Sequence, residues 1–278
     1  MTGAASPTGA AARTGEARRF RVAVLTCQDF AWETVAALAV LPEVTVAAVV
    51  RGPMPRPSLT HKLRRTWRRD GVVGVVAAVA RIALRPVRGG ASARRPVAPV
   101  EGVPQHDVSS LNADDCRALL RSLDLDLAVL DGTNILKPQT FDIPRLGSIN
   151  LHCGKLPTYR GAPPAFWELM AGEREVGVTV HQVSAELDAG AIFAEGSCPL
   201  DPAPAGDPVA YADGVWRESL RPLGLQLICR TVLALARGEA ESRPQPAAST
   251  PANRMPSRRE LQRLRDVVAA RRRGAAPR

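Results

Sequence analysis

A strand–helix–strand pattern near the N-terminus restricts the fold more than any other feature of this sequence. Residues 20–26 and 44–50 are runs of mainly apolar, β-branched side chains, and residues 30–41 between them carry apolar side chains at helical intervals. Two strands joined by a helix over so short a distance form a parallel βαβ unit. The sequence therefore predicts an α/β fold with an open, mostly parallel sheet and helices on both faces.

The same periodicities predict the elements of the remaining chain. Strands are expected at residues 126–131, 147–152 and 176–181, and helices at 113–122, 165–171, 209–238 and 257–273. Ser110 or Asn112 is expected to cap the helix at 113–122. We expect a disordered leader (1–19), a catalytic domain (20–204) with a basic insertion at about 51–100, and a helical C-terminal extension with a basic tail (205–278).

The net charge of +10 is concentrated in two segments. Residues 51–95 contain eleven Arg, one Lys and one Asp, whereas residues 257–278 contain eight Arg and two acids. Such patches attract phosphates, nucleic acids or anionic membranes, although an Arg-rich solvated surface is an equally good interpretation. Within the insertion, residues 72–84 are too short to span a bilayer and are expected to pack as a helix, with a membrane-interface role as the alternative.

Several functional classes are disfavoured by what the sequence lacks. The turn after the first strand has no GxGxxG pattern, so a nicotinamide or flavin site is not supported. The five cysteines have neither paired nor CxxC spacing, which indicates no zinc site and no disulfide framework. Residues 1–16 have no apolar core typical of a signal peptide. We therefore expect a cytoplasmic protein without a metal site or a transmembrane segment.

Three polar residues are placed where ligands bind in open α/β sheets. Asn150 and His152 lie two residues apart in a predicted strand, so their side chains share one face. A turn-rich loop follows, and Asp188 lies beside Gly190 in the loop after the next strand. Ligands of such sheets bind beyond the carboxyl ends of the strands. An amide, an imidazole and a carboxylate are therefore expected to converge at this edge.

Four motifs in this region are similar to those of the folate-dependent formyltransferases, which include methionyl-tRNA, glycinamide ribonucleotide and sugar-amine formyltransferases. The motifs are Asn150-Leu151-His152, Leu156-Pro157-x-Tyr159-Arg160-Gly161, Gly177-Val178-Thr179-x-His181 and Leu187-Asp188-x-Gly190. Their order and spacing make the resemblance specific. It implies an enzyme that takes a formyl group from the co-substrate 10-formyltetrahydrofolate.

The resemblance also implies roles for individual residues. It places the catalytic amide, imidazole and carboxylate on Asn150, His152 and Asp188. Acyl transfer needs an oxyanion donor, a base and a group that orders the base, and these three side chains can supply them. The implied folate-binding residues are Leu136, Ser184, Ala185, Glu186 and Leu187, and the implied substrate-binding residues are Tyr159, Arg160 and Gly161. Arg160 has a structural salt bridge as its alternative role, and His181 is interpreted as structural.

The amine acceptor follows less directly from the sequence. Formyltransferases acting on tRNA normally carry a C-terminal β-barrel domain, and the sequence after residue 204 has no run of alternating strands. We therefore predict a small-molecule primary amine, such as an amino sugar nucleotide or a secondary metabolite. The alternatives are an aminoacyl-tRNA bound by the basic segments, water as the acceptor in a formyltetrahydrofolate hydrolase, and a partner- or membrane-docking role for the insertion. The sequence predicts no oligomeric state and leaves a homodimer open.

Overall fold

The computed structural model describes residues 18–54, 67, 71–72, 98–248 and 250–274. Seven strands form one sheet in the order β3-β2-β1-β4-β5-β6-β7. The strands are β1 (Phe20–Thr26), β2 (Val44–Arg51), β3 (Gln105–Asp107), β4 (Leu127–Leu130), β5 (Ser148–His152), β6 (Glu175–Gln182) and β7 (Ile192–Pro199). β1 to β5 run parallel, whereas β6 and β7 are antiparallel. The predicted open, mostly parallel sheet is confirmed.

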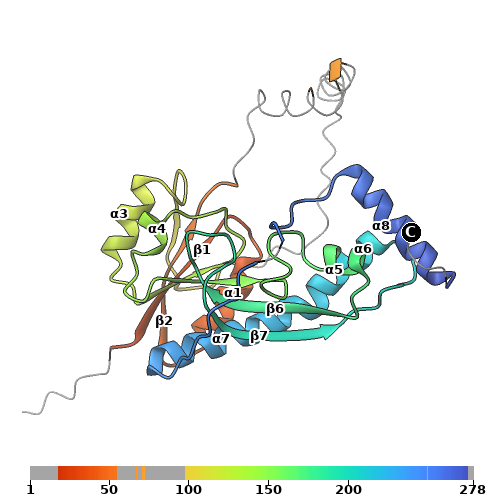
Figure 1. Ribbon diagram of the computed structural model, residues 1–278. Helices are drawn as coiled ribbons and strands as arrows, with labels where there is room; N and C mark the ends of the chain where they lie inside the picture. The colour runs from red at the N-terminus through yellow and green to blue at the C-terminus, as the bar shows by residue number, and fades with distance from the viewer. Residues whose placement is uncertain (1–17, 55–66, 68–70, 73–97, 249, 275–278) are drawn as a thin grey trace, which may run out of the picture.

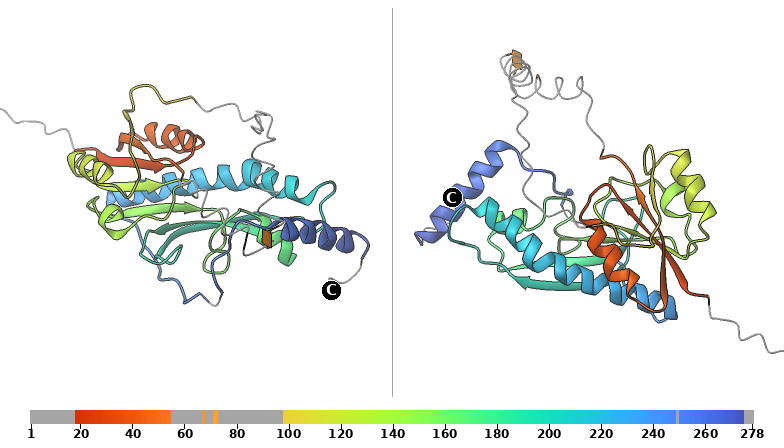
Figure 2. Two further views of the ribbon diagram at one scale, coloured as in Figure 1. Left: turned by 90° about the horizontal axis from the view of Figure 1, so that it is seen from above. Right: turned by 180° about the vertical axis from the view of Figure 1, so that it is seen from behind.

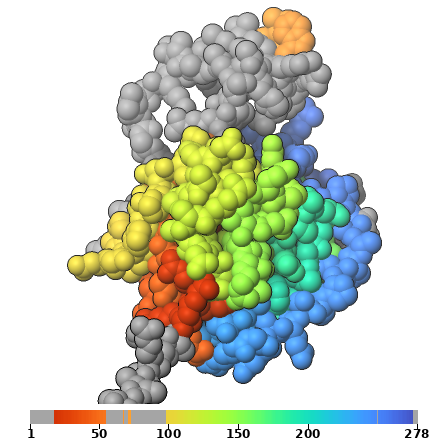
Figure 3. All heavy atoms as spheres, turned by 90° about the vertical axis from the view of Figure 1, so that its left-hand side faces the viewer, coloured from red at the N-terminus to blue at the C-terminus, as the bar shows by residue number. Residues whose placement is uncertain are grey.

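Helices cover both faces of this sheet (Figures 1 and 2). One face carries α1 (Ala31–Ala39) and α7 (Arg221–Arg237), and the other carries α3 (Asp114–Ser122) and the short α4 (Pro138–Phe141). Figure 3 shows the described residues nearest the N-terminus, in red, directly beside residues of the C-terminal part of the chain, in blue. Two ion pairs join these regions, from Arg221 to Glu33 and from Arg237 to Glu43. Helix α7 is therefore part of the central core.

Three helical segments follow one another without a break after β7. A helix α6 (Pro208–Val215) and a π-helical turn η1 (Trp216–Leu220) lead directly into α7. By length and composition alone, the run Pro208–Arg237 is apolar enough to cross a membrane. Its α7 portion instead packs on β5, β6, β7 and α1, as a core helix does.

The last helix, α8 (Arg258–Arg272), packs on α6 and on α5 (Phe166–Ala171). Ser257 and Glu260 form a capping box at its start, which fixes where the helix begins. Arg271 donates to the backbone oxygens of Leu169 and Met170, near the end of α5. Part of the charge of the basic tail is thus used inside the molecule, which leaves fewer arginines to meet an external partner.

Two expectations differ from the structure, and others fall outside it. Neither Ser110 nor Asn112 caps α3, whose N-cap is Ala113. Asn112 instead accepts from the backbone N–H of Lys137 and donates to the Ile135 oxygen, so it anchors the loop after β4. Strand β7 was not predicted. The leader before residue 18 and the expected insertion helix at 72–84 lie outside the described residues, apart from single positions.

Glu168 is an unusual feature of the core. It belongs to α5 and is only 2% exposed. Burial raises the pKa of Glu168 from its ordinary 4.5 to about 7, and the neighbouring Glu173 adds to the increase. The folded chain therefore holds this proton more tightly than the unfolded chain does. The stabilising contribution of protonated Glu168 is complete below the unfolded pKa and is lost as the pH rises through about 7.

We expect Glu168→Gln to stabilise the protein in alkaline solution, because the amide removes the cost of ionising a buried carboxyl group. The gain should be on the order of 3 kcal/mol at about pH 8 and close to zero at about pH 4. Thermal unfolding of both proteins at the two pH values measures it. Glu175→Gln, at an exposed position of β6, is the matched control. Equal stabilities of Glu168→Gln and the wild type at both pH values would contradict the prediction.

Candidate active site

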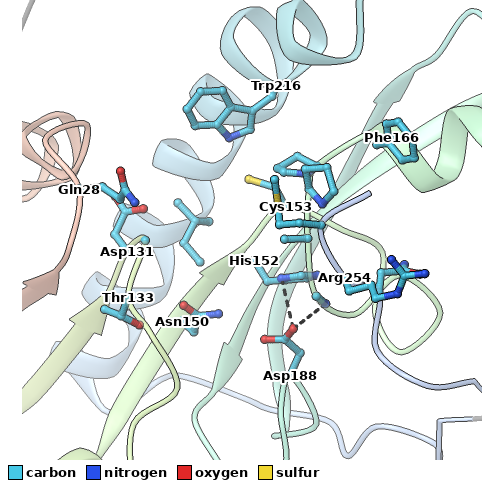
Figure 4. Close-up of a pocket in the computed structure, with 18 of the residues that line it drawn as sticks. Gln28, Asp131, Thr133, Asn150, His152, Cys153, Phe166, Asp188, Trp216 and Arg254 are labelled. Atoms are coloured by element: carbon cyan, nitrogen blue, oxygen red, sulfur yellow. Dashed lines mark hydrogen bonds and ion pairs between the residues drawn. The ribbon is translucent and has the colours of Figure 1, made fainter. Parts of the chain in front are cut away.

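A pocket of about 1100 Å³ lies at the carboxyl ends of β4 and β5. Figure 4 shows Asn150, His152 and Asp188 at its centre, with Trp216 and Arg254 on its walls. β4 and β5 are adjacent parallel strands, and the antiparallel β6 follows. The pocket therefore occupies the edge at which open α/β sheets bind ligands.

Asn150 is held by His181 across the sheet. The register of β5 and β6 places the two residues opposite each other, and Asn150 Nδ2 lies 3.2 Å from His181 Nε2. His181 Nδ1 lies 2.8 Å from the backbone oxygen of Gln182, which can only accept, so Nδ1 carries the hydrogen. Burial lowers the pKa of His181, which favours the neutral ring. Nε2 is then an acceptor, so the Asn150 amide must direct its NH₂ group toward His181.

This orientation leaves Asn150 with a donor to spare. An amide NH₂ group has two hydrogens, and His181 takes one of them. The second is available to an oxygen in the pocket, which is the requirement for stabilising an oxyanion. The imidazole of His181 therefore sets the direction of the Asn150 side chain.

His152 faces Asp188 through one nitrogen and the backbone through the other. Its Nε2 lies 2.7 Å from the carbonyl oxygen of Tyr159, so Nε2 is the protonated nitrogen of the neutral ring. Nδ1 is then the site that can take a proton, and it lies 3.7 Å from Asp188 Oδ2. Gly154 packs against Nε2 and the Tyr159 oxygen, where any larger residue would displace the ring. A proton gained at Nδ1 is thus placed beside a carboxylate.

Asp188 is fixed by its backbone as much as by its side chain. It is 8% exposed, adopts the left-handed conformation with φ 51°, and accepts at Oδ2 from the N–H of Gly161 at 2.9 Å. Its Oδ1 lies 3.7 Å from His181 Nε2. Two residues on, Gly190 approaches the carbonyl oxygen of Gln182 so closely that a Cβ would not fit. The carboxylate is therefore held by the Gly161 N–H and lies between the two imidazoles.

Gln245 holds the Asp188 loop from the C-terminal segment. Its Nε2 donates to the backbone oxygens of Asp188 at 3.1 Å and of Gly190 at 2.6 Å, and its buried Oε1 has no hydrogen-bond partner among the described residues. The segment that carries Gln245 bridges to β7 at Arg243 and to Gly161 at Asn253, and Asn253 lines the pocket.

We expect Gln245→Ala to loosen the loop that positions Asp188 without removing a reacting group. The expected result is a fall in kcat of about tenfold with a smaller change in KM, since the lost bonds are each worth about 1 kcal/mol. Steady-state kinetics measure it. Gln262→Ala, on the exposed face of α8, is the matched control. An unchanged kcat in Gln245→Ala would show that the hydrogen bonds from Gln245 to the Asp188 loop have no positioning role.

The five residues predicted to bind folate occupy two loops of this pocket. Leu136 is 5% exposed and belongs to the core, and it lines the pocket together with Ser184, Glu186 and Leu187. Ala185 is exposed and does not line it. In these two loops, the Ile135 side chain is 66% exposed and the Leu187 side chain is 37% exposed. Exposed apolar side chains of this kind fit a flat ring system.

The three residues predicted to bind the amine are placed differently from one another. Gly161 lines the pocket. Tyr159 contributes its backbone oxygen to His152, while its hydroxyl donates to Glu173 away from the site. Arg160 is buried and is absent from the pocket lining. Its guanidinium bonds to Glu186 at 2.7 Å and to the Leu187 and Thr250 oxygens, which is the structural role given above as the alternative.

A buried ion pair closes the floor of the pocket. Arg221 Nη2 lies 2.8 Å from Asp131 Oδ2, and its Nε lies 2.7 Å from Glu33. Thr34 donates to the same Asp131 oxygen at 2.6 Å. The guanidinium also lies over the Phe30 ring. These contacts tie β4, α1 and α7 together directly beneath the site.

The described residues contain no group of His, Cys, Asp and Glu side chains that could hold a metal ion. Cys153 is next to His152, but burial raises the pKa of its thiol to about 12. A thiolate nucleophile is therefore disfavoured at this position.

The sequence pattern of the family described as "Formyl transferase" matches residues 57–210, which is more than half of the chain. Among curated proteins, a methionyl-tRNA formyltransferase of Chromohalobacter salexigens is 35% identical over 147 residues, which is 52% of this chain and 43% of that protein. A methionyl-tRNA formyltransferase of Parvibaculum lavamentivorans is 34% identical over 176 residues, which is 62% of this chain and 54% of that protein. The match thus spans about half the length of these curated relatives.

Solved structures share the fold. A phosphoribosylglycinamide formyltransferase of Anaplasma phagocytophilum has a TM-score of 0.55 at 19% identity, covering 83% of this chain and 96% of that chain. A sugar N-formyltransferase from a Shewanella species has a TM-score of 0.54 at 13% identity, covering 88% and 87%. At these identities the likeness concerns the fold alone.

Proposed function

The chain belongs to the formyl transferase family, and on that premise we propose that it moves a formyl group from 10-formyltetrahydrofolate to the primary amine of a small molecule. The observation that carries the proposal is the convergence of Asn150, His152 and Asp188 in one pocket. The pocket volume of about 1100 Å³ supports it further, since sites for one drug-sized ligand are usually smaller. A co-substrate and an acceptor would both have room.

The two loops beside the cluster suit the folate. Ile135 and Leu187 offer exposed apolar side chains, and Leu136, Val183 and Ser184 line the same part of the pocket. The bound folate would supply the formyl group as an activated amide. The chain's own residues would then hold its ring and direct the formyl oxygen toward the free N–H of Asn150.

Asn150 and His152 divide the work of acyl transfer. As the amine attacks, negative charge develops on the formyl oxygen, and the neutral amide of Asn150 stabilises it without changing its own charge. His152 takes the amine proton at Nδ1, the nitrogen that Tyr159 leaves free. Asp188 lies beside that nitrogen and stabilises the imidazolium. The proton is then passed to the departing folate nitrogen.

Transfer to an aminoacyl-tRNA is the second candidate, and two observations favour it. The curated relatives are methionyl-tRNA formyltransferases. On α8, Arg258, Arg259 and Arg263 are exposed, and no ion pair involving them is found within the described residues. A nucleic acid could bind along this face, and binding would then weaken steeply with salt.

The test incubates the protein with 10-formyltetrahydrofolate and either pooled small primary amines or methionyl-tRNA, followed by mass spectrometry. We expect a small amine to become heavier by one CO group, at a rate that responds little to salt. Formylation of the aminoacyl-tRNA with a KM that increases steeply with salt would favour the second candidate. Loss of the amine product in Asn150→Ala, measured beside Gln262→Ala as the control amide outside the pocket lining, would assign the transfer to this site.

A further inference from the structure

The pocket extends beyond the Asn150–His152–Asp188 cluster into a region with mainly apolar walls. We call this region the apolar subsite, and it is lined by Phe30, Phe166, Val209, Trp216, Met255 and Leu261. These residues come from the turn before α1, from α5, α6 and η1, from the segment leading into α8, and from α8 itself. None of them belongs to the two loops assigned above to the folate. The apolar subsite is therefore the part of the pocket left for the acceptor.

Trp216 reaches this region because of the π-helical turn. Five residues separate Trp216 from Arg221, and in an α-helix two such residues would lie about 140° apart around the axis. The wider π-turn places them more nearly on one face, with the Arg221 N–H bonded to the Trp216 oxygen. Both residues consequently line the pocket. The Trp216 and Phe30 rings meet edge to face with their centroids 5.4 Å apart, which makes an aromatic wall.

The charged residues around the pocket are already paired. Arg221 lies between Asp131 and Glu33, and Arg254 makes two bonds to Glu260 at the exposed rim. Three further acidic side chains pair with cations outside the lining: Glu186 with Arg160, Asp207 with Arg265, and Asp213 with Arg217. Within the part of the chain that the structure describes, a phosphate inside the pocket would therefore meet no unpaired arginine or lysine. Burying such an anion without a partner is costly.

We infer that the acceptor is a primary amine on an apolar body, aromatic or branched aliphatic, without a phosphate group. This inference rests on the proposed function and narrows it away from the amino sugar nucleotides expected from the sequence. The body would pack against Trp216 and Phe30, and the amine would point toward His152. In the reaction the bond between the formyl carbon and the folate nitrogen breaks, an amide bond to the acceptor forms, and the amine proton ends on the folate nitrogen.

The test compares kcat/KM for benzylamine and isopentylamine with that for glucosamine 6-phosphate and for an amino sugar nucleotide. We expect the apolar amines to be at least about tenfold better, as one aromatic contact and a desolvated pocket imply. Faster transfer to the phosphorylated amines would overturn the inference while leaving the proposed function standing. Absence of transfer to any amine would instead remove the proposed function itself.

Two variants locate the preference in the apolar subsite. Trp216→Ala is expected to raise the KM for benzylamine about tenfold with little effect on kcat. Ala210→Lys tests the preference for apolar amines at an exposed position of α6 that lines the pocket. This substitution leaves the Trp216 and Phe30 side chains in place, so the variant is expected to fold. The new cation should raise the KM for benzylamine. Glu239→Ala, at an exposed position outside the lining, is the control. An unchanged KM in both pocket variants, or a preference for phosphorylated amines in the wild type that Ala210→Lys strengthens, would overturn the inference.

Discussion

Replacing His152 with alanine is expected to lower kcat for formyl transfer by about 10²–10⁴-fold, the usual contribution of a positioned base. The structure gives the reason atom by atom. Nε2 is occupied by the Tyr159 oxygen, so Nδ1 is the only ring nitrogen that can take the amine proton. Asp188 lies 3.7 Å from that nitrogen and stabilises the charge that forms. Without the ring, the amine proton loses the acceptor that lies beside Asp188.

Single-turnover kinetics with saturating co-substrate would isolate this step from binding. His106→Ala is the control, because His106 lies on β3, away from the pocket. Thermal unfolding of His152→Ala would establish that the fold is retained. A fall in kcat of less than about fivefold in a folded His152→Ala protein is incompatible with the role proposed for this residue.

Replacing Arg221 with methionine is expected to destabilise the protein by about 3–5 kcal/mol, because it leaves a buried carboxylate without its partner. Arg221 and Asp131 side chains are 5% and 4% exposed, and the guanidinium also bonds to Glu33 and to the Phe30 oxygen. Removing it leaves Asp131 with only the Thr34 hydroxyl among its described partners. Denaturant unfolding measures the loss.

The double variant Arg221→Met with Asp131→Asn separates two effects: the loss of the attraction between Arg221 and Asp131, and the cost of leaving the buried Asp131 carboxylate without a counter-charge. It should be more stable than Arg221→Met alone, since the neutral amide no longer needs a counter-charge. Arg237→Met is the matched control, because its pair with Glu43 is half exposed and such pairs contribute little. If Arg221→Met and Arg237→Met cost the same, the buried pair is not what holds β4, α1 and α7 together.

The sheet could be predicted from sequence because its strands are locally recognisable. The apolar runs of β1, β2, β4 and β6 are buried on both faces, which is typical of central strands. Strand β7 lacks this pattern. It contains Gly196 and Pro199 and is exposed at every second position, as an edge strand can be. Its pairing with β6 is a tertiary contact that the local sequence does not encode.

The candidate site shows the same division. Asn150 and His152 share a face because of the two-residue period of a strand, and this could be predicted. His181 was interpreted as structural, whereas the register of β5 and β6 places it opposite Asn150. Gln245 lies 55 residues from Gly190 along the chain, in a segment whose composition suggests only a linker. Arg160 adjoins the pocket residue Gly161 in sequence, but its side chain turns into the protein toward Glu186.

The most direct measurement follows a labelled formyl group from 10-formyltetrahydrofolate in the presence of benzylamine. We predict that the label appears in the N-formyl amide, and that this product disappears in His152→Ala. Release of the label as free formate at the same rate with or without amine would contradict it, because water would then be the acceptor. Retention of the label on the folate with benzylamine, with the phosphorylated amines and with methionyl-tRNA alike, in a folded protein, would show that this site does not transfer formyl groups.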